Sequence, residues 1–101
     1  INNVFVNATN HGFDPYAFID ALPLDRVLQM HMAGHDDSGP FLIDTHGAAV
    51  RSEVMDLFAY TLPKVGPCWV LLEWDNDIPP LAELLAHNDA LRRVGEAALA
   101  S

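Results

Sequence analysis

The sequence contains a single cysteine, Cys68, among its 101 residues. One thiol excludes an internal disulfide and a zinc site built from several cysteines. Cys68 opens an apolar stretch without a cationic residue beside it, and this context favours a small buried side chain over a reactive thiolate. A reducing, cytoplasmic setting is therefore the default expectation.

Basic residues are also scarce. Five Lys and Arg residues face fourteen acidic ones, which gives a formal net charge of −9. Because contacts to a phosphate backbone require Lys and Arg, this balance argues against a nucleic acid as partner. The charge suits cation binding, although acidic proteins without a metal are common. No apolar run is long enough to span a membrane and no signal peptide is recognisable, so we predict no membrane partner.

The chain lacks an initiator methionine and begins with Ile1. Its length alone fits one small domain, and half of its residues are hydrophobic, enough to bury a core. It contains no nucleophile elbow, no P-loop and no GxGxxG motif. We therefore expect a fragment of a larger protein whose chemistry depends on scattered polar residues.

Helical patterns occur in three segments and are ambiguous in a fourth. Asp14 and Pro15 suit the N-cap and first turn of a helix. A helix from 48 or 49 to 65, fraying near Leu62, and another from 81 to about 100 are predicted from apolar spacings of three and four. Residues 2–10 fit either a helix or a strand.

Three segments between these helices are typical of strands. Residues 25–33 alternate between two faces, and residues 41–46 form an apolar run that ends in polar residues. Residues 68–74 are continuously apolar up to an acid, as in a strand buried on both faces. Strands alternating with helices predict parallel pairing with right-handed crossovers. We expect residues 1–101 to form the C-terminal half of a TIM-type (β/α)8 barrel. The unpaired strand edges of such a half would cause an isolated fragment to self-associate.

Candidate metal ligands follow these strands. Asp44 and His46 are two residues apart, so on a strand they point to one face. His31 and Glu73 close the neighbouring apolar runs, and parallel strands present their carboxyl ends at one edge. Carboxylates and imidazoles together suit iron, manganese or zinc. Each residue also has an ordinary explanation: a helix cap for Asp44 and His46, an interior imidazole for His31 and a solvated acid for Glu73.

Other polar residues give weaker signals. His35 follows His31 by four, but Gly34 argues against a helix there, which leaves His35 in a loop. Asn3 and His11 carry almost no independent signal. The remaining candidates are predicted to be solvated surface groups: Asp36, Asp37, Asp75, Asp77 and His87.

Six short motifs, in order along nearly the whole chain, resemble one family. They are Asn2-Asn3-Val4-Phe5-Val6-Asn7, Asn10-His11-Gly12-Phe13-Asp14-Pro15, Ala21-Leu22-Pro23, His31-Met32-Ala33-Gly34-His35, Ile43-Asp44-Thr45-His46 and Glu73-Trp74-Asp75. The family is that of the multinuclear non-haem iron-dependent oxidases, long catalogued as a domain of unknown function, which includes the methanobactin-maturation oxygenase. The match is to the C-terminal half of its barrel, which is similar to xylose isomerase in fold.

The resemblance implies a specific chemistry. Members of the family bind two or three iron ions and use dioxygen to oxidise cysteine residues of a ribosomally made precursor peptide, and a recognition protein is a possible further partner. Manganese or zinc remain alternatives to iron. The resemblance makes His11 and His35 candidates for supporting a ligand or contacting substrate. The metal ligands that it implies are Asn3, His31, Asp44, His46 and Glu73.

Some features depart from the family pattern. Residues 47–49 replace the usual Asp and Pro after the Asp-x-His pair, and residues 68–70 replace a common Pro-Thr pair. The ligands that the family draws from its N-terminal half are absent, so we expect the isolated fragment to be inactive. Two other classes stay open: a divalent-metal isomerase or hydrolase on the same barrel, and a non-enzymatic peptide-binding module.

Overall fold

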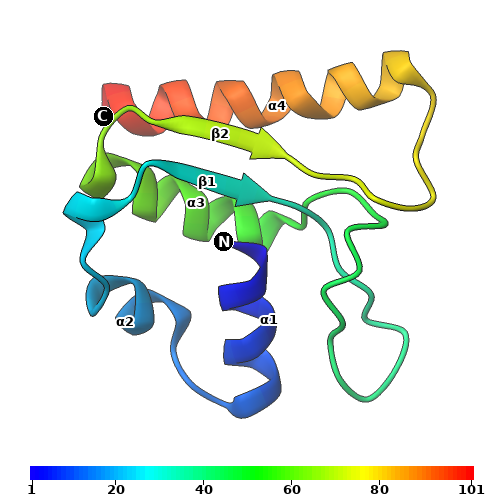
Figure 1. Ribbon diagram of the computed structural model, residues 1–101, viewed down its shortest axis with the longest axis horizontal. Coiled ribbons are helices and arrows are strands. Elements are labelled where there is room, and N and C mark those ends of the chain that lie inside the picture. The colour runs from blue at the N-terminus through cyan, green and yellow to red at the C-terminus, as the bar shows by residue number, and fades with distance from the viewer.

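A computed structural model describes residues 1–101 as a small parallel sheet packed against helices (Figure 1). This arrangement confirms the α/β class, with two strands where the sequence suggested three or four. The elements in chain order are α1 (Asn2–His11), α2 (Pro15–Asp20), the 3-10 helix η1 (Leu24–Arg26), β1 (Gln29–Met32), α3 (Ser52–Val65), β2 (Trp69–Leu72) and α4 (Leu81–Ala100).

The two strands run parallel and are connected through α3. Their register pairs His31 with Leu71 and Met32 with Leu72. The ladder continues past β2, because the Glu73 amide donates to the Met32 carbonyl oxygen over 2.8 Å. The carboxyl ends of both strands therefore meet at one edge of the molecule.

The core lies between the sheet and helices α3 and α4. Met32, Val54 and Phe58 are almost completely buried there. A Cβ atom on Gly95 of α4 would come within 3.3 Å of Leu62 and 3.4 Å of Phe58, so the glycine lets the two helices approach closely. Burying these side chains contributes about 1.5–3 kcal/mol each.

Residues 2–10, for which the sequence left two possibilities, form helix α1. The helix ends at Gly12, whose φ of 72° lies in the left-handed region that glycine adopts without strain. The next helix begins as predicted, since the Asp14 carboxylate caps it by accepting from the Tyr16 amide over 2.9 Å. A side-chain N-cap of this type stabilises a helix by about 1 kcal/mol.

The prediction of a strand at residues 41–46 was wrong. This segment makes a single antiparallel bridge, between Asp36 and Ile43, and otherwise forms a loop. Phe41 and Ile43 are 64% and 56% exposed. An apolar run becomes a regular strand only where a neighbouring strand pairs with it, and no strand of the sheet lies beside this one.

Other boundaries also differ from the predictions. The strand predicted at 25–33 is shortened to β1 because residues 24–26 form η1 after Pro23. Helix α3 begins at Ser52 rather than at 48 or 49, and it continues through Pro63 to Val65 instead of fraying at Leu62.

Strand β2 is not buried on both faces. Trp69 is 83% exposed and Leu71 52% exposed, because helices cover only the opposite face of the sheet. Helix α4 has the predicted bounds, but Leu81 and Leu85 of its expected apolar stripe are exposed as well. None of the helices combines the length and the apolar character that a membrane span requires.

Candidate metal centre

The carboxyl ends of β1 and β2 bring a histidine and an acid together. His31 lies in β1, and Glu73 directly follows β2. The His31 Nδ1 atom is 2.7 Å from Glu73 Oε1. The convergence expected of parallel strands is thus present at this edge.

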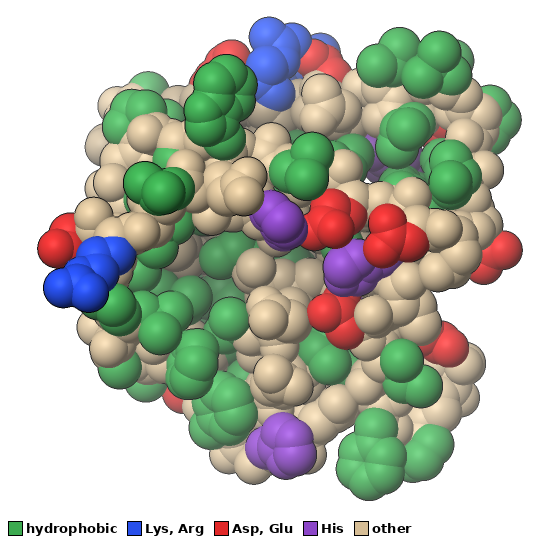
Figure 2. All heavy atoms as spheres, viewed as in Figure 1, with side chains coloured by type: hydrophobic (Ala, Val, Ile, Leu, Met, Phe, Trp, Pro, Cys, Tyr) green, Lys and Arg blue, Asp and Glu red, His purple; other side chains and the backbone are tan.

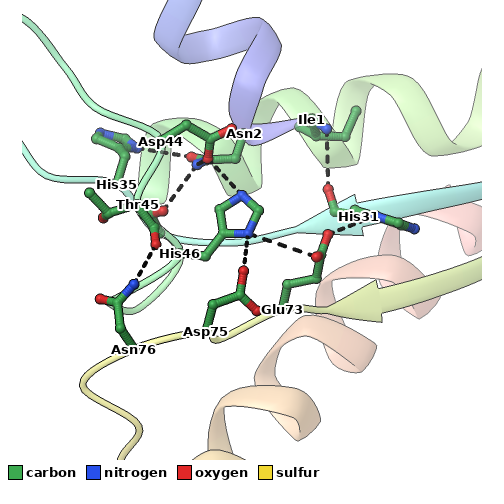
Figure 3. Close-up of polar contacts among 11 residues, drawn as sticks. Ile1, Asn2, His31, His35, Asp44, Thr45, His46, Glu73, Asp75 and Asn76 are labelled. Carbon is green, nitrogen blue, oxygen red and sulfur yellow. Dashed lines mark hydrogen bonds and ion pairs between the residues drawn. The ribbon is translucent and has the colours of Figure 1, made fainter.

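Asp44 and His46 join this pair from the loop between β1 and α3 (Figure 3). The Nε2 atom of His46 is 2.8 Å from Asp44 Oδ1. Its other ring nitrogen, Nδ1, is 3.0 Å from Asp75 Oδ2 and 3.7 Å from Glu73 Oε2. Asp44 and His46 are therefore in contact, but they lie in a loop and not on one face of a strand as predicted.

The backbone holds His46 in an unusual conformation. Its φ of 55° is in the left-handed region, which costs a non-glycine residue about 1–2 kcal/mol. The His46 amide donates to the Gly34 carbonyl oxygen over 3.2 Å, and the His46 carbonyl oxygen accepts from the Asp75 amide over 2.7 Å. A Cβ on Gly34 would lie 2.2 Å from the Ala48 carbonyl oxygen, so only glycine permits this approach.

Behind Asp44 lies a buried polar network. Asn2 and His35 are each only 3% exposed. Asn2 Nδ2 donates to Asp44 Oδ1 over 2.6 Å and to the Gly34 carbonyl oxygen over 3.0 Å. Asn2 Oδ1 is 2.9 Å from His35 Nδ1. Burial, reinforced by Arg51, lowers the pKa of His35, so this imidazole is held neutral.

Two residues that the resemblance singled out lie outside the cluster. Asn3 is exposed and lines the wall of a cavity of about 450 Å³, which His31 and His46 also line. His11 is exposed at the end of α1 and lines a separate cavity of about 330 Å³ with Asn3. The structure thus places Asn3 beside the cluster and His11 one helix length away from it.

Sequence reasoning missed two residues of the site. Asp75 was predicted to be a solvated loop tip, yet His46, Glu73 and Asp75 offer ligand atoms within 4.8 Å of one another. Its spacing of two from Glu73, in extended chain, was the available signal. The second missed residue is Asn2: of the two adjacent asparagines, Asn2 is the buried one, whereas the resemblance had pointed to Asn3.

The donor atoms of the cluster fit a divalent metal. The ion pairs of Asp44, Glu73 and Asp75 involve only histidines. Figure 2 shows acidic and histidine side chains gathered in the middle of this face, with Lys and Arg side chains at its margins. Carboxylate oxygens beside imidazole nitrogens, without a neighbouring Lys or Arg, are a ligand set that iron, manganese and zinc share.

Comparison with known proteins places this chain in a family. The family model described as "RiPP precursor modification enzyme MbnB/TglH/ChrH" matches residues 1–96, where RiPP denotes a ribosomally synthesised, post-translationally modified peptide. The chain belongs to the MbnB/TglH/ChrH family. This result confirms the resemblance that the six sequence motifs indicated.

Curated relatives of this MbnB/TglH/ChrH family chain carry the designation UPF0276. A UPF0276 protein of Anaeromyxobacter sp. (strain Fw109-5) is 48% identical over the whole chain, which covers 36% of that relative. One from Acaryochloris marina is 51% identical over 85% of the chain and 31% of its own length. One from Pseudomonas aeruginosa is 49% identical over the whole chain and 37% of its own length. The chain thus spans about a third of the curated relatives it matches, and no solved structure matches it.

Proposed function

We propose that this MbnB/TglH/ChrH family chain belongs to an iron-dependent oxidase that modifies cysteine residues of a ribosomally made precursor peptide with dioxygen. Family membership supports the peptide substrate class. The observation that carries the metal dependence is the position of His46, whose Nδ1 atom faces both Asp75 and Glu73. A recognition protein that presents the peptide is part of the same proposal.

The metal would be held chiefly by His46, Glu73 and Asp75, which offer one nitrogen and two carboxylate oxygens. His31 supports Glu73 from β1 through its 2.7 Å contact and adds a second imidazole beside the site. Asp44 and Asn3 are further ligands that the family resemblance implies, whereas Asp75 is added by the structure. Mixed N/O ligands suit iron and leave it open positions, and manganese or zinc would accept the same atoms.

Bound iron would supply the capacity to pass electrons from a thiol to dioxygen. The residues of this chain orient and tune that centre. Glu73 spans two imidazoles, with Oε1 2.7 Å from His31 and Oε2 3.7 Å from His46. Three carboxylates around two imidazoles concentrate negative charge, which favours the higher oxidation state of a bound metal. Two or three ions are proposed for the complete protein.

We further propose that residues 1–101 form the C-terminal half of a larger (β/α)8 barrel. One edge of β1 pairs with β2, and its other edge is open except where the Ile1 nitrogen donates to the His31 carbonyl oxygen over 3.1 Å. Beside that edge lies the cavity of about 450 Å³, whose walls include Leu22, Leu24 and Val27. A further parallel strand would cover the apolar part of this cavity wall; in an isolated fragment, the same edge would favour self-association.

The metal dependence is tested by replacing His46. Anaerobically purified protein is loaded with Fe(II), desalted, and its iron content measured for wild type, His46→Ala and the control His87→Ala. His87 lies on α4, where it pairs with Glu83 over 3.8 Å and packs against Trp74, and it is not one of the clustered candidate ligands. We expect His46→Ala to lose iron and His87→Ala to retain it. Equal iron content in all three proteins would contradict the proposed centre.

A further inference from the structure

The loop between β1 and α3 carries two of the proposed metal ligands, Asp44 and His46. The three residues that precede Asp44 are weakly anchored in the core. Phe41 and Ile43 are exposed, and Leu42 between them is only half-buried. Because apolar burial contributes little here, the position of this segment depends chiefly on hydrogen bonds.

Residues 41–43 form one side of a short antiparallel pairing. Ile43 exchanges both of its backbone hydrogen bonds with Asp36, each over 2.9 Å. In such a pairing, successive residues direct their N–H and C=O groups to opposite edges, so the backbone groups of Leu42 face away from Asp36. No strand of the sheet pairs with this segment, and the Leu42 groups therefore need another partner.

A side chain of α1, which lies beside this loop (Figure 1), takes the place of the missing strand. Asn10 Nδ2 donates to the Leu42 carbonyl oxygen over 2.8 Å, and Asn10 Oδ1 accepts from the Leu42 amide over 2.7 Å. An asparagine side chain has the donor and the acceptor of a peptide group, so these two bonds reproduce one rung of a β-ladder. A reversed amide would oppose donor to donor and acceptor to acceptor, and the pair of bonds therefore fixes one orientation.

We propose that Asn10 is a positioning residue of the metal centre, which holds the backbone of Leu42 and thereby places Asp44 among the ligands. Two residues of chain span at most about 7 Å, so a displacement of Leu42 is passed on to Asp44. This role rests on the proposed metal centre, in which Asp44 remains a ligand. It adds a residue that acts on the centre from α1 without touching the metal.

The other supports of this loop act on different atoms. The Asp75 amide donates to the His46 carbonyl oxygen over 2.7 Å and holds the far side of the loop. Asn2, at the start of α1, donates to the Asp44 carboxylate over 2.6 Å. Only Asn10 connects α1 to the backbone of residues 41–44. Because the other supports persist when Asn10 is replaced, we expect a misplaced ligand and not an unfolded loop.

Two variants and one control test this role. Asn10→Ala removes both hydrogen bonds, and since alanine favours a helix more than asparagine does, α1 itself is not weakened. Asn10→Asp keeps the size of the side chain but sets a carboxylate oxygen against the Leu42 carbonyl oxygen. The control is Asn7→Ala, which makes the same chemical change at an exposed position of the same helix.

The first measurement is hydrogen exchange of the Leu42 amide, followed by NMR without metal. This amide donates to Asn10 in the wild type, so its exchange reports the contact directly. We expect exchange to be about 10-fold faster in Asn10→Ala and unchanged in Asn7→Ala, since one hydrogen bond is lost only in the former. Equal exchange rates in wild type and Asn10→Ala would overturn the proposal.

The second measurement is metal binding, with Zn(II) affinity from competition titration and the visible spectrum of bound Co(II) as a report of ligand geometry. We expect both Asn10 variants to bind Zn(II) about 10-fold more weakly and to change the Co(II) spectrum, and Asn7→Ala to match the wild type. Faster Leu42 exchange with unchanged affinity and spectrum would make Asn10 purely structural and overturn its positioning role. A wild type that binds neither metal would instead refute the proposed metal centre, and the positioning role with it.

Discussion

His31 and Glu73 lie across the carboxyl ends of two parallel strands, with Nδ1 of the histidine 2.7 Å from Oε1 of the acid. The residues belong to strands connected by the whole of α3, so this contact exists only in the folded sheet. The second oxygen of Glu73 faces His46, 3.7 Å away. Glu73 is therefore the residue through which the sheet and the loop after β1 meet at the site.

Replacing Glu73 should weaken metal binding more than folding. Glu73→Gln keeps the size of the side chain but removes the negative charge between His31 and His46. We expect Fe(II) or Zn(II) affinity to fall about 10–100-fold or more, since a ligand atom is lost. The measurement is metal titration by calorimetry, with Glu83→Gln as control because Glu83 lies on α4 and pairs only with His87. Equal affinities of the two variants would remove Glu73 from the ligand set.

Gly34 should be intolerant of alanine. A Cβ at this position would lie 2.2 Å from the Ala48 carbonyl oxygen, a backbone atom that cannot move aside without shifting the loop. We expect Gly34→Ala to destabilise the fold by about 1–3 kcal/mol, as overpacking does. Thermal or urea unfolding measures the loss. Gly39→Ala is the control, because a Cβ on Gly39 meets nothing within 4 Å, and a comparable loss there would refute the steric explanation.

The stability of the metal-free protein should depend on pH through His35. Burial, and to a lesser degree Arg51, lowers the pKa of His35 below its ordinary value of 6.5. Between the folded and the ordinary pKa, the unfolded chain binds a proton that the folded protein does not. The stability contributed by neutral His35 is thus complete above pH 6.5 and is lost as the pH falls through the folded pKa.

The check is urea unfolding at several pH values below and above 6.5, for wild type and for His35→Asn. The variant has no titrating group at this position, so its unfolding free energy should fall less steeply on acidification. Parallel pH profiles for the two proteins would be inconsistent with a lowered pKa for His35.

Helices whose ends carry capping or helix-starting residues, or whose apolar residues recur every three or four positions, could be predicted from the sequence. Asp14 and Pro15 start α2, and α4 has the bounds expected from its apolar spacing. The meeting of His31 and Glu73 followed from parallel strands alone. These features depend on short-range chemistry and on one topological rule, both of which a single sequence carries.

The loop after β1 could not be predicted in the same way. Residues 41–43 have the composition of a strand, but whether they pair depends on a neighbour far along the chain. The contribution of Asp75 depends on the left-handed backbone of His46, which nothing in the adjacent residues signals. The burial of Asn2 required knowing that residues 2–10 are helical and how that helix packs.

The exposed face of the sheet gives the protein a built-in optical reporter. Trp69 projects from β2 with 83% of its surface accessible, whereas Trp74 packs against His87 with ring centroids 5.2 Å apart and ring planes tilted by 50°. The indole of Trp69 therefore emits from a water-like environment for as long as that face is bare. If another polypeptide chain covered the sheet, the fluorescence of Trp69 would shift to shorter wavelength, and the rate of that shift would report the rate of association. In a Trp74→Phe variant, Trp69 would be the sole source of this tryptophan signal.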